Sequence, residues 1–285
     1  MLATLLMGSS PAAVLNLLAW KPGIKIARSI PYGEGARRTL DVYQLETAVA
    51  APVAVFFYGG SWQSGSKEIY RFLGVALARR GYLTVIPDYR LYPETRYPGF
   101  LDDAASAARW AKNNATRFGG DPNNVYVMGQ SAGAYIAAML AFDSRWLQTV
   151  DMVPGGDIRG IVGISGPYDF LPLRDGTLKT IFGGANDATT QPISHVTSGA
   201  PPALLVSGAN DRTVEPGNSM RLAERLRAAG DSATVRTYAR VGHFTIISAF
   251  APALRFLAPV LRDITAFVAE TAYPYRGAEQ TETVP

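Results

Sequence analysis

The chain of 285 residues contains no cysteine and only two histidines, His195 and His243. The absence of cysteine excludes disulfide bonds, zinc sites with thiolate ligands and cysteine nucleophiles. Two histidines are too few for a typical transition-metal site, and the sequence holds no HExxH motif. We therefore expect no metal and no cofactor, and an imidazole that acts as a base must be one of these two.

Charged residues are also scarce, because Asp, Glu, Lys and Arg make up 18% of the chain, against about 25% in an average globular protein. The net charge is +4, but the basic residues form no run, which argues against a nucleic-acid partner. Hydrophobic residues make up 48%, enough for the core of one large domain. The oligomeric state is left open.

The first twenty residues, MLATLLMGSSPAAVLNLLAW, carry no charge. A secretory signal normally begins with Lys or Arg, and a membrane span needs about 20 apolar residues without strong breakers. We interpret residues 1–23 as an apolar segment that forms a lid or touches a membrane peripherally. A docked amphipathic helix, a membrane anchor and the remnant of a longer signal are all open for it. At the other end, residues 276–285 are expected to form a flexible tail.

Strand patterns alternate with helical patterns along residues 24–275, which we interpret as one domain without a linker. Apolar runs typical of buried strands lie at 52–58, 83–87, 125–128, 158–164 and 203–206, with further strand patterns at 39–45 and 234–239. Helical spacing occurs at 67–80, 101–118, 132–142 and 218–229. The alternation predicts an α/β fold, a mostly parallel twisted sheet with helices on both faces. Residues 167–200 break it and are expected to form a small cap over the strand ends.

The sequence Gly129-Gln-Ser-Ala-Gly133 lies where an apolar run ends and a helical pattern begins. A sharp turn from strand to helix holds its central residue in a strained conformation and projects the side chain above the sheet edge. Glycines on both sides allow the turn, because side chains there would strike the neighbouring elements. The pattern therefore predicts that Ser131 is a nucleophile, whereas a serine N-cap alone would not explain both glycines.

A serine nucleophile needs a base. His243 follows the last predicted strand and Asp211 follows the strand at 203–206, so both fall at the sheet edge where the active groups of parallel sheets gather. The order Ser131, Asp211, His243 is that of the Ser–Asp–His hydrolases. The competing trio Ser131, Asp169, His195 keeps this order, but His195 follows no strand. We predict the first trio.

An acyl transfer also needs N–H donors for the oxyanion. The N–H of Ala132 is one candidate, and those of Gly60 and Ser61, after the strand at 52–58, are the others. Gly60 to Gly65 has the spacing of a phosphate-binding loop, but Ser66 stands where that loop requires lysine. Aromatic and aliphatic residues near the strand ends are the candidate walls of a substrate pocket: Trp62, Phe170, Leu171 and Phe244.

Seven motifs together, FFYGGSW, DYRLYPE, GGDPNNV, GQSAG, SGPYDF, SGANDRTV and VGH, resemble the α/β-hydrolase fold. More narrowly, the chain resembles the hormone-sensitive-lipase and carboxylesterase branch, near feruloyl-esterase-like and kynurenine-formamidase-like enzymes. The resemblance covers roughly residues 24 to 245. It implies a triad of Ser131, Asp211 and His243 and an oxyanion hole of Gly60, Ser61 and Ala132.

The chain departs from this family at Tyr58, which stands where the family usually has the histidine of His-Gly-Gly. That histidine shapes the loop and transfers no proton, so a tyrosine hydroxyl could replace it. Asp88 and Arg90 are expected to brace the neighbouring loop as an ion pair. The expected function is that of a serine carboxylesterase acting on small-molecule esters of short to medium chain length. An amidase or arylformamidase with the same triad, and a catalytically silent binding protein, are the alternatives.

Overall fold

The computed structural model describes residues 15–16, 19 and 22–272. The expected flexible tail and most of the apolar segment 1–23 therefore lie outside the described residues. None of the helices in the described part is both long and apolar enough to cross a bilayer.

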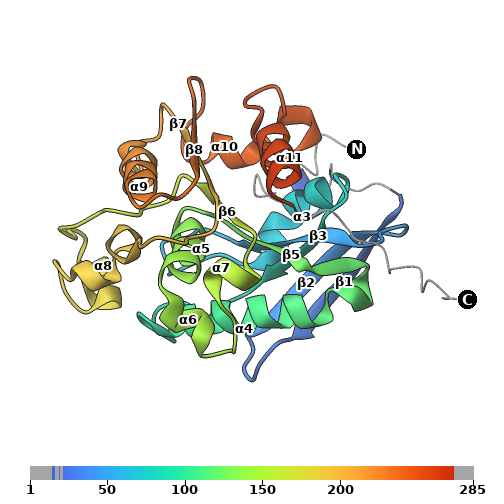
Figure 1. The fold of residues 1–285 in the computed structure, drawn as a ribbon, viewed down its shortest axis with the longest axis horizontal. Coiled ribbons are helices and arrows are strands. Elements are labelled where there is room, and N and C mark those ends of the chain that lie inside the picture. Colours follow the sequence, from blue (N-terminus) through green and yellow to red (C-terminus); the bar gives the residue numbers. More distant parts are fainter. Residues whose placement is uncertain (1–14, 17–18, 20–21, 273–285) are drawn as a thin grey trace, which may run out of the picture.

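One eight-stranded sheet runs through the molecule in the order β1-β2-β4-β3-β5-β6-β7-β8 (Figure 1). The strand β1 pairs antiparallel with β2, and β2 pairs antiparallel with β4. Every other pairing is parallel. The prediction of a mostly parallel sheet is thus confirmed. The strands are β1 (Ile24–Pro31), β2 (Thr39–Leu45), β3 (Ala51–Phe57), β4 (Leu83–Pro87), β5 (Gly120–Gln130), β6 (Gly160–Ile164), β7 (Ala203–Gly208) and β8 (Ala233–Tyr238).

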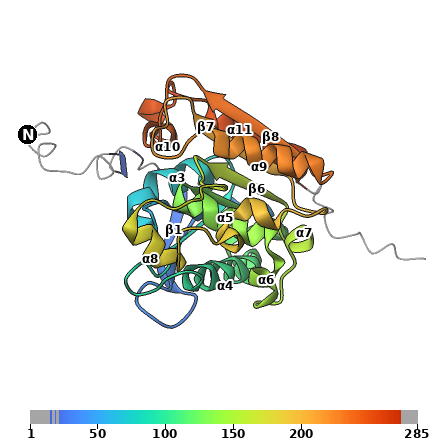
Figure 2. The same cartoon turned by 90° about the vertical axis from the view of Figure 1, so that its left-hand side faces the viewer.

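Helices cover both faces of this sheet (Figures 1 and 2). The helices α3 (Arg71–Ala78) and α11 (Val260–Thr271) lie on one face, and α4 (Gly99–Asn114) and α5 (Ala132–Phe142) lie on the other. The helix α9 (Gly217–Ala228) connects β7 to β8. Short helices complete the described part: α6 (Ser144–Gln148), α7 (Pro154–Asp157), α8 (Gly176–Phe182), α10 (Thr245–Ser248), and the 3₁₀ turns η1 (Lys67–Tyr70), η2 (Thr116–Phe118), η3 (Ala188–Thr190), η4 (Pro192–His195) and η5 (Pro252–Leu254).

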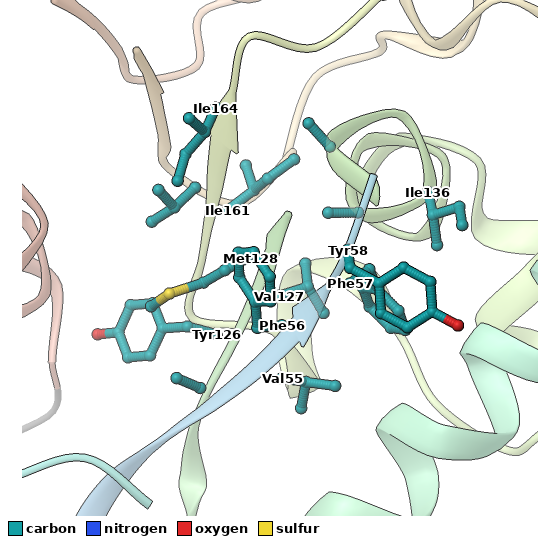
Figure 3. Packing of buried hydrophobic residues seen from close by; sticks show 14 of the residues in the cluster. Val55, Phe56, Phe57, Tyr58, Tyr126, Val127, Met128, Ile136, Ile161 and Ile164 are labelled. Carbon is teal, nitrogen blue, oxygen red and sulfur yellow. The ribbon is translucent and has the colours of Figure 1, made fainter. Parts of the chain in front are cut away.

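The centre of the core lies around β3 and β5, whose side chains are buried on both faces of the sheet (Figure 3). Strands in the middle of a parallel sheet have no solvated face, which explains their unbroken apolar sequences. The residues drawn there are Val55, Phe56, Phe57 and Tyr58 from β3 and its end, Tyr126, Val127 and Met128 from β5, Ile136 from α5, and Ile161 and Ile164 from β6.

The helix α5 is buried at every one of its residues. A helix that is apolar on all sides belongs in a protein interior, and its five alanines let it pack close to the strands. Because α5 follows β5 after a single residue, Ser131, this residue is anchored between a central strand and a central helix.

Candidate active site

Ser131 occupies the turn between β5 and α5 with φ 54° and ψ −123°. This conformation is rare for a residue with a side chain and marks stored strain. A Cβ atom at position 129 would overlap the carbonyl of Gly133, and one at position 133 would overlap the carbonyl of Phe57. The backbone N–H of Ser131 donates to the carbonyl of Ile164 at 2.8 Å. The glycines therefore admit the close approach of helix and strand that the sequence predicted.

Asp211 and His243 form a buried pair at the same edge of the sheet. His243 Nδ1 lies 2.8 Å from Asp211 Oδ2, and both residues are almost fully buried. The other oxygen of Asp211 accepts hydrogen bonds from the backbone N–H groups of Thr213 and Val214, each at 2.9 Å. A proton on Nδ1, held by the carboxylate, leaves the lone pair on Nε2 free to act as a base.

The Nε2 atom of His243 contacts Gln130, the residue directly before Ser131. Gln130 Nε2 lies 3.2 Å from it, and Tyr70 donates to Gln130 Oε1 at 3.3 Å, which orients the amide with its N–H toward the imidazole. In residues 22–272 the Ser131 hydroxyl makes no hydrogen bond. Catalytic hydrogen bonds often tighten only once substrate is bound, and here the Gln130 amide occupies the Nε2 position. Nothing in the sequence indicated this contact beyond the position of Gln130 inside GQSAG.

The competing histidine has other partners. His195 Nε2 lies 2.8 Å from the carbonyl oxygen of Thr189, and its Nδ1 lies 3.6 Å from Asp143 Oδ2. Asp169 is bound to Arg221 at 2.6 Å. The structure therefore does not bring Asp169 and His195 together as a relay. Burial raises the pKa of Asp143, but the hydrogen bond from Arg145 and the nearby His195 outweigh burial and lower this pKa below its usual value.

Three backbone N–H groups lie free around the Ser131 turn. Gly60 and Ser61 adopt φ values of 134° and 53°, and in the described part of the chain neither N–H, nor that of Ala132, donates to a protein acceptor. Ser61, Ser131 and Ala132 line one cavity. Free N–H groups at a helix N-terminus and in a strained loop are suited to an oxyanion, so these residues are the candidate oxyanion hole.

Tyr58 ties the Gly59–Gly65 loop to charged partners. Its hydroxyl donates to Asp88 Oδ1 at 2.8 Å and accepts from Arg37 Nη2 at 2.8 Å. The Lys67 ammonium lies 2.8 Å from Asp88 Oδ2, and although burial opposes the charge, the hydrogen bonds to Asp88 and Glu68 raise the pKa of Lys67. Tyr58 is thus part of a buried network beneath the loop.

The prediction of an ion pair between Asp88 and Arg90 is wrong. Arg90 binds Asp103 instead, with Nη2 2.8 Å from Oδ1, while Asp88 binds Lys67. Both residues follow the end of β4, and their partners lie on different elements, Lys67 in η1 and Asp103 in α4, so the two charges brace different parts of the fold.

The cavity beside Ser131 has a volume of about 550 Å³. Trp62, Phe170 and Leu171 line it, as the sequence predicted, and the Trp62 and Phe170 rings stack with centroids 6.2 Å apart. Phe244 does not line the cavity, which corrects the expectation. It is 73% exposed and stands edge-on to the His243 ring, because the turn into α10 directs Ile246 and Ile247 inward and leaves Phe244 outside.

Asp169, Arg174, Glu215 and Arg221 also contribute to the cavity wall. The described residues contain no group of three or more His, Asp or Glu side chains placed to hold a metal ion. The site as described offers a hydroxyl, a carboxylate–imidazole pair and free N–H groups.

Comparison with known proteins places this arrangement in a family. The family model described as BD-FAE matches residues 40–226. Isoprenylcysteine alpha-carbonyl methylesterase ICME of Arabidopsis thaliana is 31% identical in an alignment 245 residues long, which covers 77% of this chain and 56% of that protein. Esterase LipC of Mycobacterium tuberculosis is 31% identical in an alignment 225 residues long, which covers 72% of this chain and 56% of that protein. The chain thus spans about half the length of these relatives.

Solved structures show the same fold. Thermogutta terrifontis esterase 2 phosphoramylated by tabun superposes with a TM-score of 0.71 and 23% identity, over 90% of this chain and 97% of that one. The order of the strands, the strained turn at Ser131 and these matches agree with one another. The chain has the α/β-hydrolase fold and belongs to the BD-FAE family.

Proposed function

We propose that the protein is a serine carboxylesterase that hydrolyses short- to medium-chain carboxylic esters through an acyl-enzyme. The observation that carries this proposal is the strained Ser131, which opens on a cavity next to the Asp211–His243 pair. The names of the relatives, a methylesterase and an esterase, support hydrolysis of carboxylic esters.

In the proposed first step the Ser131 hydroxyl attacks the ester carbonyl and gives its proton to His243 Nε2. Asp211 holds the proton on Nδ1 and stabilises the imidazolium that forms. For this transfer the Gln130 amide must release Nε2, which it contacts at 3.2 Å. The N–H groups of Gly60, Ser61 and Ala132 donate hydrogen bonds to the carbonyl oxygen and stabilise the negative charge that develops on it.

In the second step the bond to the alcohol breaks, and His243 returns the proton to the departing oxygen. Water then enters, His243 removes its proton, and the resulting hydroxide attacks the acyl-Ser131 carbonyl. The tetrahedral intermediate formed by this attack then breaks its bond to Ser131, which releases the carboxylic acid, and His243 returns the proton to the Ser131 oxygen. The residues named supply every proton transfer in both steps.

The preference for short to medium chains rests on the shape of the cavity. Its volume of about 550 Å³ falls within the range of small-ligand sites. The stacked Trp62 and Phe170 form an aromatic wall next to Ser131. The Tyr135 and Phe182 rings pack edge-on against Trp62 with centroids 5.1 and 4.8 Å away, so this wall is rigid. A series of p-nitrophenyl esters tests the preference, and maximal kcat/KM above twelve carbons would contradict it.

The experiment that tests the catalytic proposal is Ser131→Ala. We expect a loss of nearly all turnover of p-nitrophenyl acetate and no labelling by a fluorophosphonate probe, with an unchanged circular dichroism spectrum. His195→Asn is the matched control, because it alters the histidine that contacts Thr189 and Asp143 and should retain activity. Undiminished turnover in Ser131→Ala would refute the assignment.

The same panel separates ester hydrolysis from its alternatives. Phenyl acetate and an N-formyl anilide, assayed in parallel, distinguish an esterase from an arylformamidase. A catalytically silent binding protein would leave the fluorophosphonate probe unreacted at Ser131.

A further inference from the structure

Three arginines gather on the α3 side of the sheet without a carboxylate among them. Arg79 and Arg80 follow the last residue of α3, and Arg255 follows η5. In the described part of the chain none of the three forms an ion pair. Arg79 and Arg255 line the same small hollow, and burial together with the positive charges of Arg80 and Arg79 lowers the pKa of Arg255. We call Arg79, Arg80, Arg255 and Phe256 the basic face.

The basic face also carries an apolar residue. Phe256, next to Arg255, is 80% exposed, although most of the large hydrophobic side chains of the described residues are buried. Arg79 and Arg255 border a small hollow together with Ala19, Phe72 and Pro252. Cationic and apolar groups therefore lie next to each other at this surface.

The apolar N-terminal sequence joins the fold at this surface. Asn16 accepts a hydrogen bond from the backbone N–H of Phe72 at 2.8 Å, and its amide donates to the carbonyl of Glu68 at 2.8 Å. Ala19 is buried in the hollow beside Arg79. Residues 1–14, which precede this attachment, contain no charged residue. The chain thus enters the domain next to the three arginines.

We propose that the basic face docks on the surface of an anionic lipid bilayer, with Phe256 entering the interface. Peripheral membrane segments combine this pair of features, since apolar groups partition into the headgroup boundary and cations contact anionic lipids. A second copy of the chain is a poor occupant, because a symmetric contact would bring two sets of unpaired guanidinium groups together. A nucleic acid would match the arginines but not the apolar residues Ala19, Phe72 and Pro252 of the adjoining hollow.

The docking is independent of the catalytic proposal, and its test requires no turnover. The full chain is sedimented with phosphatidylcholine vesicles containing roughly a third phosphatidylglycerol, and with vesicles of phosphatidylcholine alone. We expect binding to the first and much weaker binding to the second, with a loss at high salt. Each arginine near an anionic surface strengthens binding about fivefold, so the triple variant Arg79→Gln/Arg80→Gln/Arg255→Gln should bind at least about tenfold more weakly, screening included.

The matched control is Arg109→Gln/Arg117→Gln/Arg227→Gln, which removes the same net charge from α4, η2 and α9. Of these, α4 lies on the face of the sheet opposite α3 (Figures 1 and 2), and α9 packs on β7 and β8, whereas α3 packs on β2 and β4. The control should bind as the unchanged protein does, and Phe256→Ser should bind more weakly. Equal binding of the two triple variants, binding to DNA as tight as to anionic vesicles, or a changed oligomeric state in the basic-face variant would each overturn the proposal. Circular dichroism checks that every variant is folded.

Discussion

Replacing Tyr58 by phenylalanine tests whether the network beneath the Gly59–Gly65 loop positions the oxyanion donors. The change keeps the buried ring, which stacks on Tyr89 with centroids 4.7 Å apart, and removes only the hydroxyl. That hydroxyl makes two hydrogen bonds to charged partners, one to Asp88 and one from Arg37, both at 2.8 Å. Each partner keeps other bonds, because Asp88 still accepts from Lys67 and Arg37 still donates to Gly65.

Two hydrogen bonds to charged groups are lost, but the remaining bonds of both partners compensate in part. The free energy of unfolding should therefore fall by about 1.5–3 kcal/mol. For a domain of this size this corresponds to a fall in Tm of about 3–12 °C. The expected fall in kcat is about tenfold. It is smaller than the ~10²–10³ that follows loss of an oxyanion donor, because the Tyr89 hydroxyl still holds the carbonyl of Tyr58 at 2.7 Å.

Thermal unfolding and steady-state hydrolysis of p-nitrophenyl acetate measure the two effects. Tyr43→Phe is the matched control, since its buried hydroxyl also donates to a carboxylate, Asp41 Oδ2 at 3.3 Å, but lies on β2, far along the sheet from Ser131. We expect it to lose stability and to keep its kcat. An unchanged kcat in Tyr58→Phe, or an equal fall in both variants, would refute the positioning role.

Three further predictions concern other parts of the molecule. Gln130→Met removes the amide that contacts His243 Nε2 and so frees this atom to act as a base. Because a neutral hydrogen bond contributes about 0.5–1.5 kcal/mol, fluorophosphonate labelling of Ser131 should become about 2- to 10-fold faster. Slower labelling would mean that Gln130 assists the base. Asp103→Ala leaves Arg90 and Arg38 without their fully buried carboxylate. Urea unfolding should therefore show a free energy of unfolding lower by about 3 kcal/mol, the lower end for a broken buried pair. A decrease below about 1 kcal/mol would indicate that water solvates both arginines. Burial raises the pKa of Tyr43, Tyr58 and Tyr89 above the ordinary value of 10.0, so the unfolded chain loses these protons at a lower pH than the folded protein. The free energy of unfolding should therefore be constant at neutral pH and fall above about pH 10, by up to about 1.4 kcal/mol per pH unit for each tyrosine. A flat profile in urea unfolding between pH 8 and 11 would contradict this.

The sequence predicted the central strands and α5 because their apolar runs are set by burial on both faces. It missed β1, which lies at the sheet edge and has mostly exposed or half-buried side chains. It also predicted too short a strand at residues 125–128. The polar residues Gly120–Asn124 belong to β5 because Gly120 pairs with Ala51 across the sheet, a tertiary contact that local pattern cannot reveal.

The apolar run from Phe244 to Leu261 had no clear secondary structure in the sequence. The structure divides it at its prolines, with Pro252 opening η5 and Pro259 preceding α11. Proline fits the first turn of a helix because it lacks only an N–H that has no partner there. The candidate triad could be predicted because each member lies in the loop or turn that follows a strand, β5, β7 or β8. The Gln130–His243 contact could not, because it depends on side-chain rotamers brought together by the fold.

The cavity wall has a consequence for how the protein can change over time. Its floor belongs to the Ser131 turn and the Gly59–Gly65 loop, but most of its remaining sides come from the segments 167–178 and 213–221. Insertions or substitutions in those two surface segments would reshape what the cavity accepts while β5, β7 and β8 keep their register. New substrate ranges can therefore evolve on this scaffold without rebuilding the strand ends that hold Ser131, Asp211 and His243.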